Sequence, residues 1–138
     1  MTGSRSSHPG SRPHWVFLWG PVLAYALLIF ALSSASDLPD LPERLSDKLA
    51  HVLLYSGLGF LLARALAGGL GRPVPGWAPP LVVLLAMLYG LSDEVHQLFV
   101  PRRRFDLLDL LADAVGAGLG AAAVWLWGIL SRPGDAFR

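Results

Sequence analysis

Four long apolar runs decide what this chain can fold into. They cover approximately residues 15–32, 49–67, 77–91 and 114–130, and polar or turn-rich stretches separate them. A helix of about 20 apolar residues is long enough to cross the hydrocarbon core of a bilayer. The sequence therefore predicts an all-α, polytopic integral membrane protein with four transmembrane helices and both termini on the same side.

The composition supports the membrane class over a soluble one. Hydrophobic residues make up 54% of the chain and charged residues 15%, whereas about a quarter of a soluble domain is charged. A soluble helix bundle is the alternative, but each of its helices should carry a polar face. The first and fourth runs have none over their central turns. The net charge of +1 indicates no nucleic-acid partner, and the absence of cysteine excludes disulfides and thiol chemistry.

The turn-rich stretches divide the chain into one domain and two tails. Residues 1–14 are rich in Ser, Gly, Pro and Arg and are typical of a disordered tail. Residues 15–131 form the membrane domain, and residues 132–138 form a short C-terminal tail. The expected helices cover about 15–33, 48–67, 77–99 and 105–130. The sequence "ALSSAS" after the first run is similar to a signal-peptide cleavage site, but that run exceeds a usual h-region of about 7–15 residues.

The basic residues favour one orientation by a small margin. The side that holds the termini collects six cations, namely Arg5, Arg12, Arg64, Arg72, Arg132 and Arg138. The other side collects five, namely Arg44, Lys48, Arg102, Arg103 and Arg104. Because cytoplasmic loops carry the excess of Lys and Arg, the sequence predicts cytoplasmic termini.

Polar residues concentrate at the membrane face opposite the termini. The stretch "LSDEVHQLFVPRRRFDLLDLLAD", residues 91–113, holds five carboxylates, one histidine and three arginines. The alternation of helices brings it level with the start of the second helix. At helical spacing, three polar stripes arise there, with Glu94 about 100° from Asp93. The stripes are Asp47, His51 and Tyr55 with Lys48 beside them, then Tyr89, Asp93 and His96 or Gln97, then Asp106, Asp109 and Asp113.

Such a concentration needs compensation inside the protein. One Asp or Arg at the bilayer centre costs about 2.5–3.5 kcal/mol, and three acids on one helix face repel each other. We therefore expect these groups to face the bundle interior or a wet cavity and to pair with cations, a metal or protons. The small residues Ala112, Gly116 and Gly120 form another stripe, which favours close helix packing.

The candidate site residues follow from these stripes. As acid, base or metal ligand we expect Glu94, His96 and Asp109. As binding residues we expect Asp47, Lys48, His51, Tyr55, Asp93, Gln97, Arg103 and Asp106. No cofactor is evident; a divalent metal near His51 stays possible, although the short fixed spacing of a zinc motif is missing.

The segments "SDKLAHVLLYSGLGFLLA" and "LYGLSDEVHQLFVPRRRFDLLDLLADAVGAGLG" resemble the VanZ-like family of small bacterial membrane proteins. The resemblance covers nearly the whole chain after the N-terminal tail. It implies a multi-pass protein of the bacterial cytoplasmic membrane, linked in its teicoplanin-resistance namesake with low-level glycopeptide tolerance, and it implies no established reaction. The matching polar positions are Asp47, Lys48, His51, Tyr55, Asp93, Glu94, Gln97, Pro101, Arg103, Asp106 and Asp109. Asp113 stands where the family often has Asn, and Arg102 where Gly is common.

Three functions are compatible with this pattern. The polar cluster could bind or act on a lipid-linked envelope molecule, with Arg103 holding a phosphate or carboxylate. It could instead be a structural ion-pair network in a protein that modulates envelope partners without chemistry. A proton or ion pathway is the third, but the acids lie near one face only. The expected partners are membrane lipids and a lipid-linked envelope precursor; whether a reaction occurs, and the oligomeric state, stay open.

Overall fold

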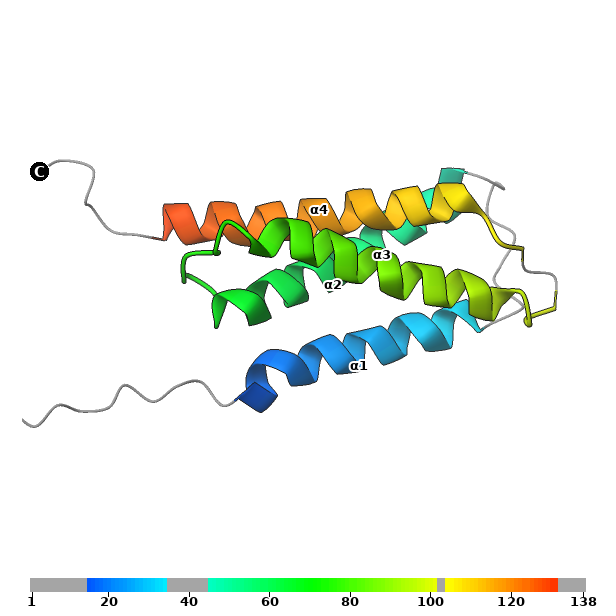
Figure 1. Cartoon of the computed structure of the whole chain (residues 1–138), viewed down its shortest axis with the longest axis horizontal. Helices are drawn as coiled ribbons and strands as arrows, with labels where there is room; N and C mark the ends of the chain where they lie inside the picture. Colours follow the sequence, from blue (N-terminus) through cyan, green and yellow to red (C-terminus); the bar gives the residue numbers. More distant parts are fainter. Residues whose placement is uncertain (1–14, 35–44, 102–103, 132–138) are drawn as a thin grey trace, which may run out of the picture.

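The computed structural model describes residues 15–34, 45–101 and 104–131. Within these ranges four helices and no strands occur: α1 (Trp15–Ser33), α2 (Leu45–Ala67), α3 (Ala78–Gln97) and α4 (Leu107–Leu130). All four are long and apolar enough to cross a membrane, which confirms the predicted fold class. The start of α1 and the end of α4 lie at the same end of the bundle (Figure 1). The predicted tails, residues 1–14 and 132–138, lie outside the described residues.

A glycine ends α2 and turns the chain toward α3. Gly68 has a φ of 77°, a left-handed conformation that only glycine adopts without strain. The N–H of Gly69 donates to the carbonyl of Arg64 at 2.9 Å, and that of Gly68 to Ala65 at 3.0 Å. This crossed pair of hydrogen bonds satisfies carbonyls that the end of a helix leaves free.

The turn between α3 and α4 shortens both helices relative to the ranges expected from the sequence. α3 ends at Gln97 rather than near residue 99, because Leu98, Phe99 and Val100 donate to carbonyls three residues back. α4 starts at Leu107 rather than near residue 105. The Asp106 side chain caps it by accepting from the N–H of Leu108 at 2.9 Å.

A proline inside α1 leaves a backbone carbonyl free to contact α2. Pro21 has no N–H, so the carbonyl of Phe17, four residues earlier, loses its helical donor. Arg64 of α2 donates from both terminal guanidinium nitrogens to that carbonyl, each at 3.2 Å. Arg64, the cation that interrupts the second apolar run, is therefore hydrogen-bonded to the backbone of α1.

α2 and α4 pack with their backbones in close contact. A Cβ added to Gly116 would overlap the carbonyl oxygen of Val52, and one added to Gly120 would overlap that of Ser56. On the α2 side, a Cβ on Gly59 would overlap the backbone of Ala117. The small-residue stripe predicted on the fourth helix is thus confirmed as a helix-packing surface.

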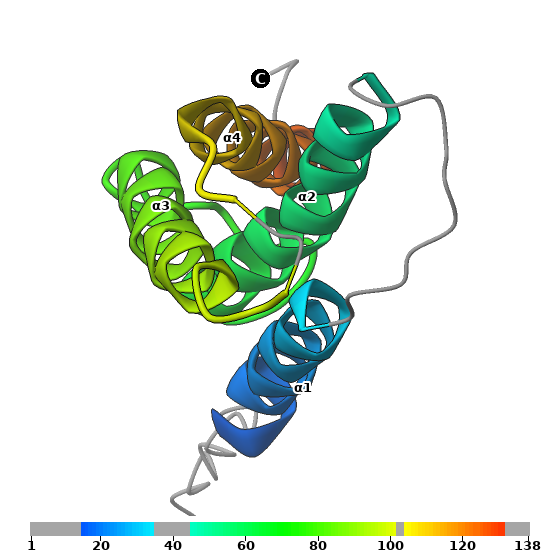
Figure 2. The ribbon, with the colours of Figure 1, turned by 90° about the vertical axis from the view of Figure 1, so that its right-hand side faces the viewer.

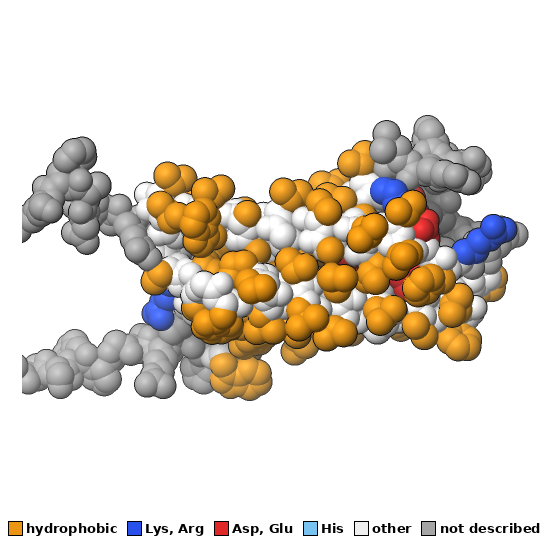
Figure 3. Space-filling view, turned by 45° about the horizontal axis from the view of Figure 1, so that its top comes forward, with side chains coloured by type: hydrophobic (Ala, Val, Ile, Leu, Met, Phe, Trp, Pro, Cys, Tyr) orange, Lys and Arg blue, Asp and Glu red, His pale blue; other side chains and the backbone are white. Residues whose placement is uncertain are grey.

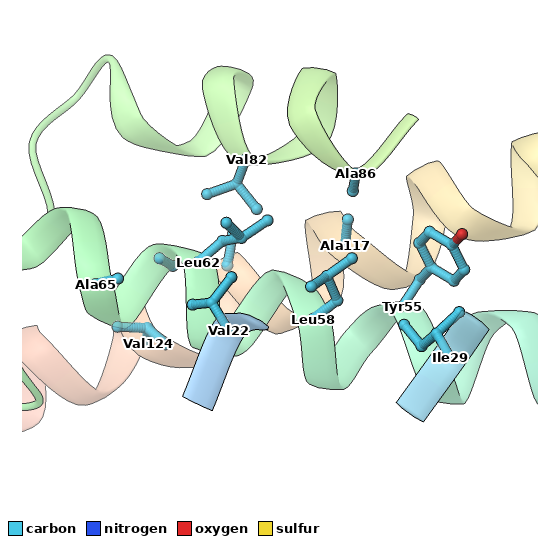
Figure 4. Packing of buried hydrophobic residues seen from close by; sticks show 12 residues of the cluster. Val22, Ile29, Tyr55, Leu58, Leu62, Ala65, Val82, Ala86, Ala117 and Val124 are labelled. Atoms are coloured by element: carbon cyan, nitrogen blue, oxygen red, sulfur yellow. The ribbon is translucent and has the colours of Figure 1, made fainter. Parts of the chain in front are cut away.

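Apolar side chains form the core and also cover the outside. Figure 4 shows Val22 of α1 beside Leu58 and Leu62 of α2, and Ile29 of α1 beside Tyr55 of α2, with Val82 of α3 on the other side of Leu62. Large apolar side chains are also exposed along every helix, as the space-filling view shows (Figure 3). A surface of this kind matches lipid rather than water. Seen from one end, α1 lies on the side of the bundle away from α4 and packs mainly against α2 (Figure 2).

Candidate functional site

The described buried polar side chains gather at one end of the bundle. Here α1 and α3 end and α2 and α4 begin, at the right of Figure 1; we call this the polar end. Figure 3 shows acidic side chains at this end of the visible face. The buried polar and charged residues of the described chain are Ser33, Asp93, Glu94, Gln97, Asp109 and Asp113. Residues of three helices, α1, α3 and α4, therefore meet at one end of the bundle.

Lys48 links the start of α2 to the start of α4. Its ammonium group lies 2.6 Å from Asp106 Oδ2 and also donates to Asp109 Oδ1. Asp47 lies beside it, 3.9 Å away. Because the Asp109 side chain is buried, this pairing compensates a charge that α4 carries into the bundle.

His51 lies about one helical turn after Asp47 in α2 and contacts two acidic residues of α4, Asp109 and Asp113. Its Nδ1 lies 2.8 Å from Asp113 Oδ1, and its Nε2 lies 3.8 Å from Asp109 Oδ2. When Asp113 is ionised, its oxygens only accept hydrogen bonds, and His51 Nδ1 is then the donor. The exposed fraction of the Asp113 side chain is 1% and that of His51 is 13%. The imidazole is therefore oriented by a buried carboxylate and directs Nε2 toward Asp109.

α1 joins the site through two serines at its C-terminal end. Ser33 donates to Asp93 Oδ1, and Gln97 donates to the other Asp93 oxygen at 3.3 Å. Ser34 shares a hydrogen bond of 3.1 Å with His96 Nε2. The His96 ring also lies 4.6 Å from that of Phe30. His96 is thus directed to α1, and no contact within the described ranges joins it to Glu94 or Asp109.

Three buried polar atoms have no hydrogen-bond partner within the described part of the chain. They are Tyr55 Oη, Glu94 Oε1 and Asp113 Oδ2. The other Glu94 oxygen accepts from the backbone N–H of Asp106 at 2.8 Å. Asp113 also packs against Gly90, where an added Cβ would overlap its carboxylate. Unsatisfied polar atoms in a core are costly and call for a functional or structural reason.

A pocket of ≈ 60 Å³ opens at the polar end between α1, α2 and α3. It is large enough for a few water molecules. Its lining is partly apolar, with Ile29 and Leu32 from α1 and Leu54 from α2. Its polar lining residues are Ser33, Asp47, His51, Tyr55, Asp93 and Gln97.

The structure brings most, but not all, of the predicted site residues together. Asp47, His51, Tyr55, Asp93 and Gln97 line the pocket. Lys48, Asp106 and Asp109 form the adjacent ion-pair group, and Glu94 lies buried behind it. Arg103 and Arg102 lie outside the described residues.

Sequence reasoning missed the serines of α1 and gave Asp113 no role in the site. The contacts of Ser33 and Ser34 connect α1 to Asp93 and His96. The signal available for them was the serine-rich turn after the first apolar run. Asp113 was expected on the polar stripe of the fourth helix but was not among the candidate site residues, yet it is the partner of His51.

The four helices and the polar end define a small, multi-pass membrane protein. A family model described as VanZ/LLP1 matches residues 14–128. The chain therefore belongs to the VanZ family, as its motifs predicted. Neither the curated proteins nor the solved structures contain a match.

Proposed function

We propose that the protein binds the anionic headgroup of a lipid-linked or other cell-envelope molecule at the polar end. The observation that supports this most is the mixed lining of the pocket. Ile29, Leu32 and Leu54 offer apolar contacts, while Ser33, Tyr55 and Gln97 offer hydrogen bonds. A lipid molecule likewise joins a polar headgroup to an apolar chain, so both parts would find matching side chains in the pocket.

An anionic group needs cations, because Asp47 and Asp93 both line the pocket. Among the described residues, Lys48 is already paired with Asp106 and Asp109. The sequence provides further positive charge on this side, namely Arg44 and the three arginines between α3 and α4. A guanidinium group binds a phosphate or carboxylate through two parallel hydrogen bonds. We propose Arg103 as the residue that makes this contact.

The orientation and the location of the protein belong to the same proposal. The cation count favours cytoplasmic termini, which places the polar end at the outer leaflet of the bacterial cytoplasmic membrane. A ligand would then come from the outer leaflet, where lipid-linked envelope precursors are exposed. A link with glycopeptide tolerance is proposed on family membership alone.

A structural ion-pair network is the second candidate. It is favoured by Lys48 and His51, whose charged or polar atoms already face Asp106, Asp109 and Asp113. Acid–base chemistry by Glu94, His96 and Asp109 has less support, since His96 is directed to α1. A proton pathway also has less support, because the buried polar side chains of the described ranges all lie at one end.

Arg103→Ala is expected to weaken binding of a polyprenyl phosphate by about 10- to 100-fold, the loss of one charge-assisted contact. Native mass spectrometry of the detergent-purified protein, titrated with the polyprenyl phosphate, measures the bound fraction. The wild-type protein should also retain a co-purified anionic lipid that the variant loses. Phosphatidylcholine serves as a probe without net charge.

Arg72→Ala is the matched control, since it removes the same charge from the α2–α3 connection at the opposite end of the bundle. It should bind the polyprenyl phosphate as the wild type does. The structural alternative predicts a different pattern, in which Arg103→Ala yields less folded protein but the folded fraction binds unchanged. Equal binding by the wild type and both variants would reject headgroup recognition by Arg103.

A further inference from the structure

We propose that Asp47, His51 and Asp109 form a binding site for a divalent transition-metal ion. One ligand atom from each of these side chains lies within 4.8 Å of the other two. Two of the residues come from α2 and one from α4, so the site joins the helices that pack most closely. The site does not depend on the proposed headgroup binding.

The distances suit one ion after a small adjustment. Bonds of about 2.0–2.2 Å to nitrogen and oxygen allow one ion to join ligand atoms up to roughly 4.2 Å apart. His51 Nε2 and Asp109 Oδ2, at 3.8 Å, already meet this condition. Asp47 has a side chain that is 42% exposed and is therefore free to rotate toward the ion.

The environment of His51 is an independent reason to expect an ion. Metal-binding histidines usually donate their second N–H to a carboxylate, which fixes the ring and raises the basicity of the ligating nitrogen. The buried Asp113 carboxylate takes this part at Nδ1. The free nitrogen, Nε2, then faces Asp109 Oδ2 across a gap too long for a hydrogen bond. A cation between these two acceptors would satisfy both.

The local charge also favours a cation. Asp47, Asp106 and Asp109 surround the ammonium group of Lys48, and Asp113 lies against His51. Lys48 is the only lysine among the described residues. Lys48 takes Asp109 Oδ1, which leaves Oδ2 for the ion. A divalent ion would therefore reduce an excess of negative charge without displacing the lysine.

The ligand set and the pocket define what kind of site this is. One imidazole and two carboxylates suit Mn²⁺, Fe²⁺ or Zn²⁺, whereas Ca²⁺ prefers six to eight oxygen ligands. Asp47 and His51 also line the pocket, so the remaining coordination positions would face it. Water, or an oxygen atom of a bound headgroup, could occupy those positions.

Mn²⁺ binding measured by electron paramagnetic resonance tests the site directly. The full-length protein is purified in dodecyl maltoside, treated with EDTA, freed of it and titrated with MnCl₂ in the absence of added lipid. The wild type is expected to bind one Mn²⁺ per chain. Zn²⁺ should displace the ion, and an equal concentration of Ca²⁺ should not.

Asp47→Asn should weaken Mn²⁺ binding at least tenfold and should fold normally, because the Asp47 side chain is 42% exposed and its one ion pair within the described ranges is the 3.9 Å contact with Lys48. Ser92→Ala is the control. It removes a polar group near the same end of α3, where the Ser92 hydroxyl is exposed and donates to the Tyr89 carbonyl of its own helix, and it should change the affinity by less than about threefold.

A thermal melt gives a second reading, because an ion that binds only the folded state raises the melting temperature. Mn²⁺ should stabilise the wild type and Ser92→Ala more than Asp47→Asn. The proposal is overturned if the wild type binds no Mn²⁺ stoichiometrically, or if Asp47→Asn and Ser92→Ala lose affinity equally. Polyprenyl phosphate binding measured in EDTA separates this outcome from a failure of headgroup recognition.

Discussion

Gly120→Ala is expected to destabilise the bundle, although alanine normally stabilises a helix relative to glycine by about 0.8–1.0 kcal/mol. The added methyl group would overlap the carbonyl oxygen of Ser56 on α2 and meet the backbone nitrogen of Phe60. Both are backbone atoms, so no side-chain rotation relieves the overlap and the helices must separate. Overpacking of this kind costs about 1–3 kcal/mol or more.

Gly118→Ala provides the matched control in the same helix. A Cβ there would meet only Val83 Cγ2, at an ordinary distance of 4.0 Å. The two variants should therefore shift the melting temperature in detergent in opposite directions, downward for Gly120→Ala and slightly upward for Gly118→Ala. Equal shifts in the two would mean that α2 and α4 are not in backbone contact at Gly120.

His51→Ala is expected to cause the largest loss among substitutions at the polar end. It leaves the Asp113 carboxylate, which is buried, without its imidazole partner. Removing one member of a buried ion pair costs about 3–5 kcal/mol, because the remaining charge is uncompensated. The yield of monodisperse protein on size-exclusion chromatography and its melting temperature, both measured in EDTA, report the loss.

Asp113→Asn separates the effect of the charge from the effect of lost packing. Alone, it removes a charge but keeps a side chain of the same shape that can accept from His51. Combined with His51→Ala, it should recover a large part of the stability lost in the single His51→Ala variant. Strict additivity of the two losses would show that His51 and Asp113 are not coupled.

The helices could be predicted from the sequence because hydrocarbon imposes a simple condition on each of them. A segment that crosses a bilayer must satisfy its backbone hydrogen bonds internally and present apolar side chains outward. The apolar runs that form α1 and α4 could be recognised as membrane-spanning from their composition alone. The ends were harder to predict, because tight turns after Gln97 and the Asp106 cap depend on local hydrogen bonds.

The polar end could be predicted as a location but not as a set of partners. Helical spacing correctly placed Asp47 and His51 on one stripe and Asp109 and Asp113 on another. Spacing within one helix does not say which residue of a neighbouring helix faces it, since this depends on the rotation of each helix about its axis. The pairing of His51 with Asp113 therefore became visible only in the structure.

The same limit explains His96 and α1. His96 is close in sequence to Glu94, which favoured a shared role for the two, but successive residues of a helix point in different directions. His96 contacts Ser34 and Phe30, whereas Glu94 is buried against the start of α4. α1 contains no charged residue that would have indicated that its C-terminal end contributes to the site.

The central claim is that the polar residues of α2, α3 and α4 meet at a single membrane face. The chain contains no cysteine, so single cysteines at Ser34, Arg104, Leu70 and Ser131 can be labelled with a membrane-impermeant maleimide in intact cells and in inverted vesicles. Ser34 and Arg104 should label from one side, and Leu70 and Ser131 from the other. Labelling of Ser34 and Arg104 from opposite sides would contradict the claim.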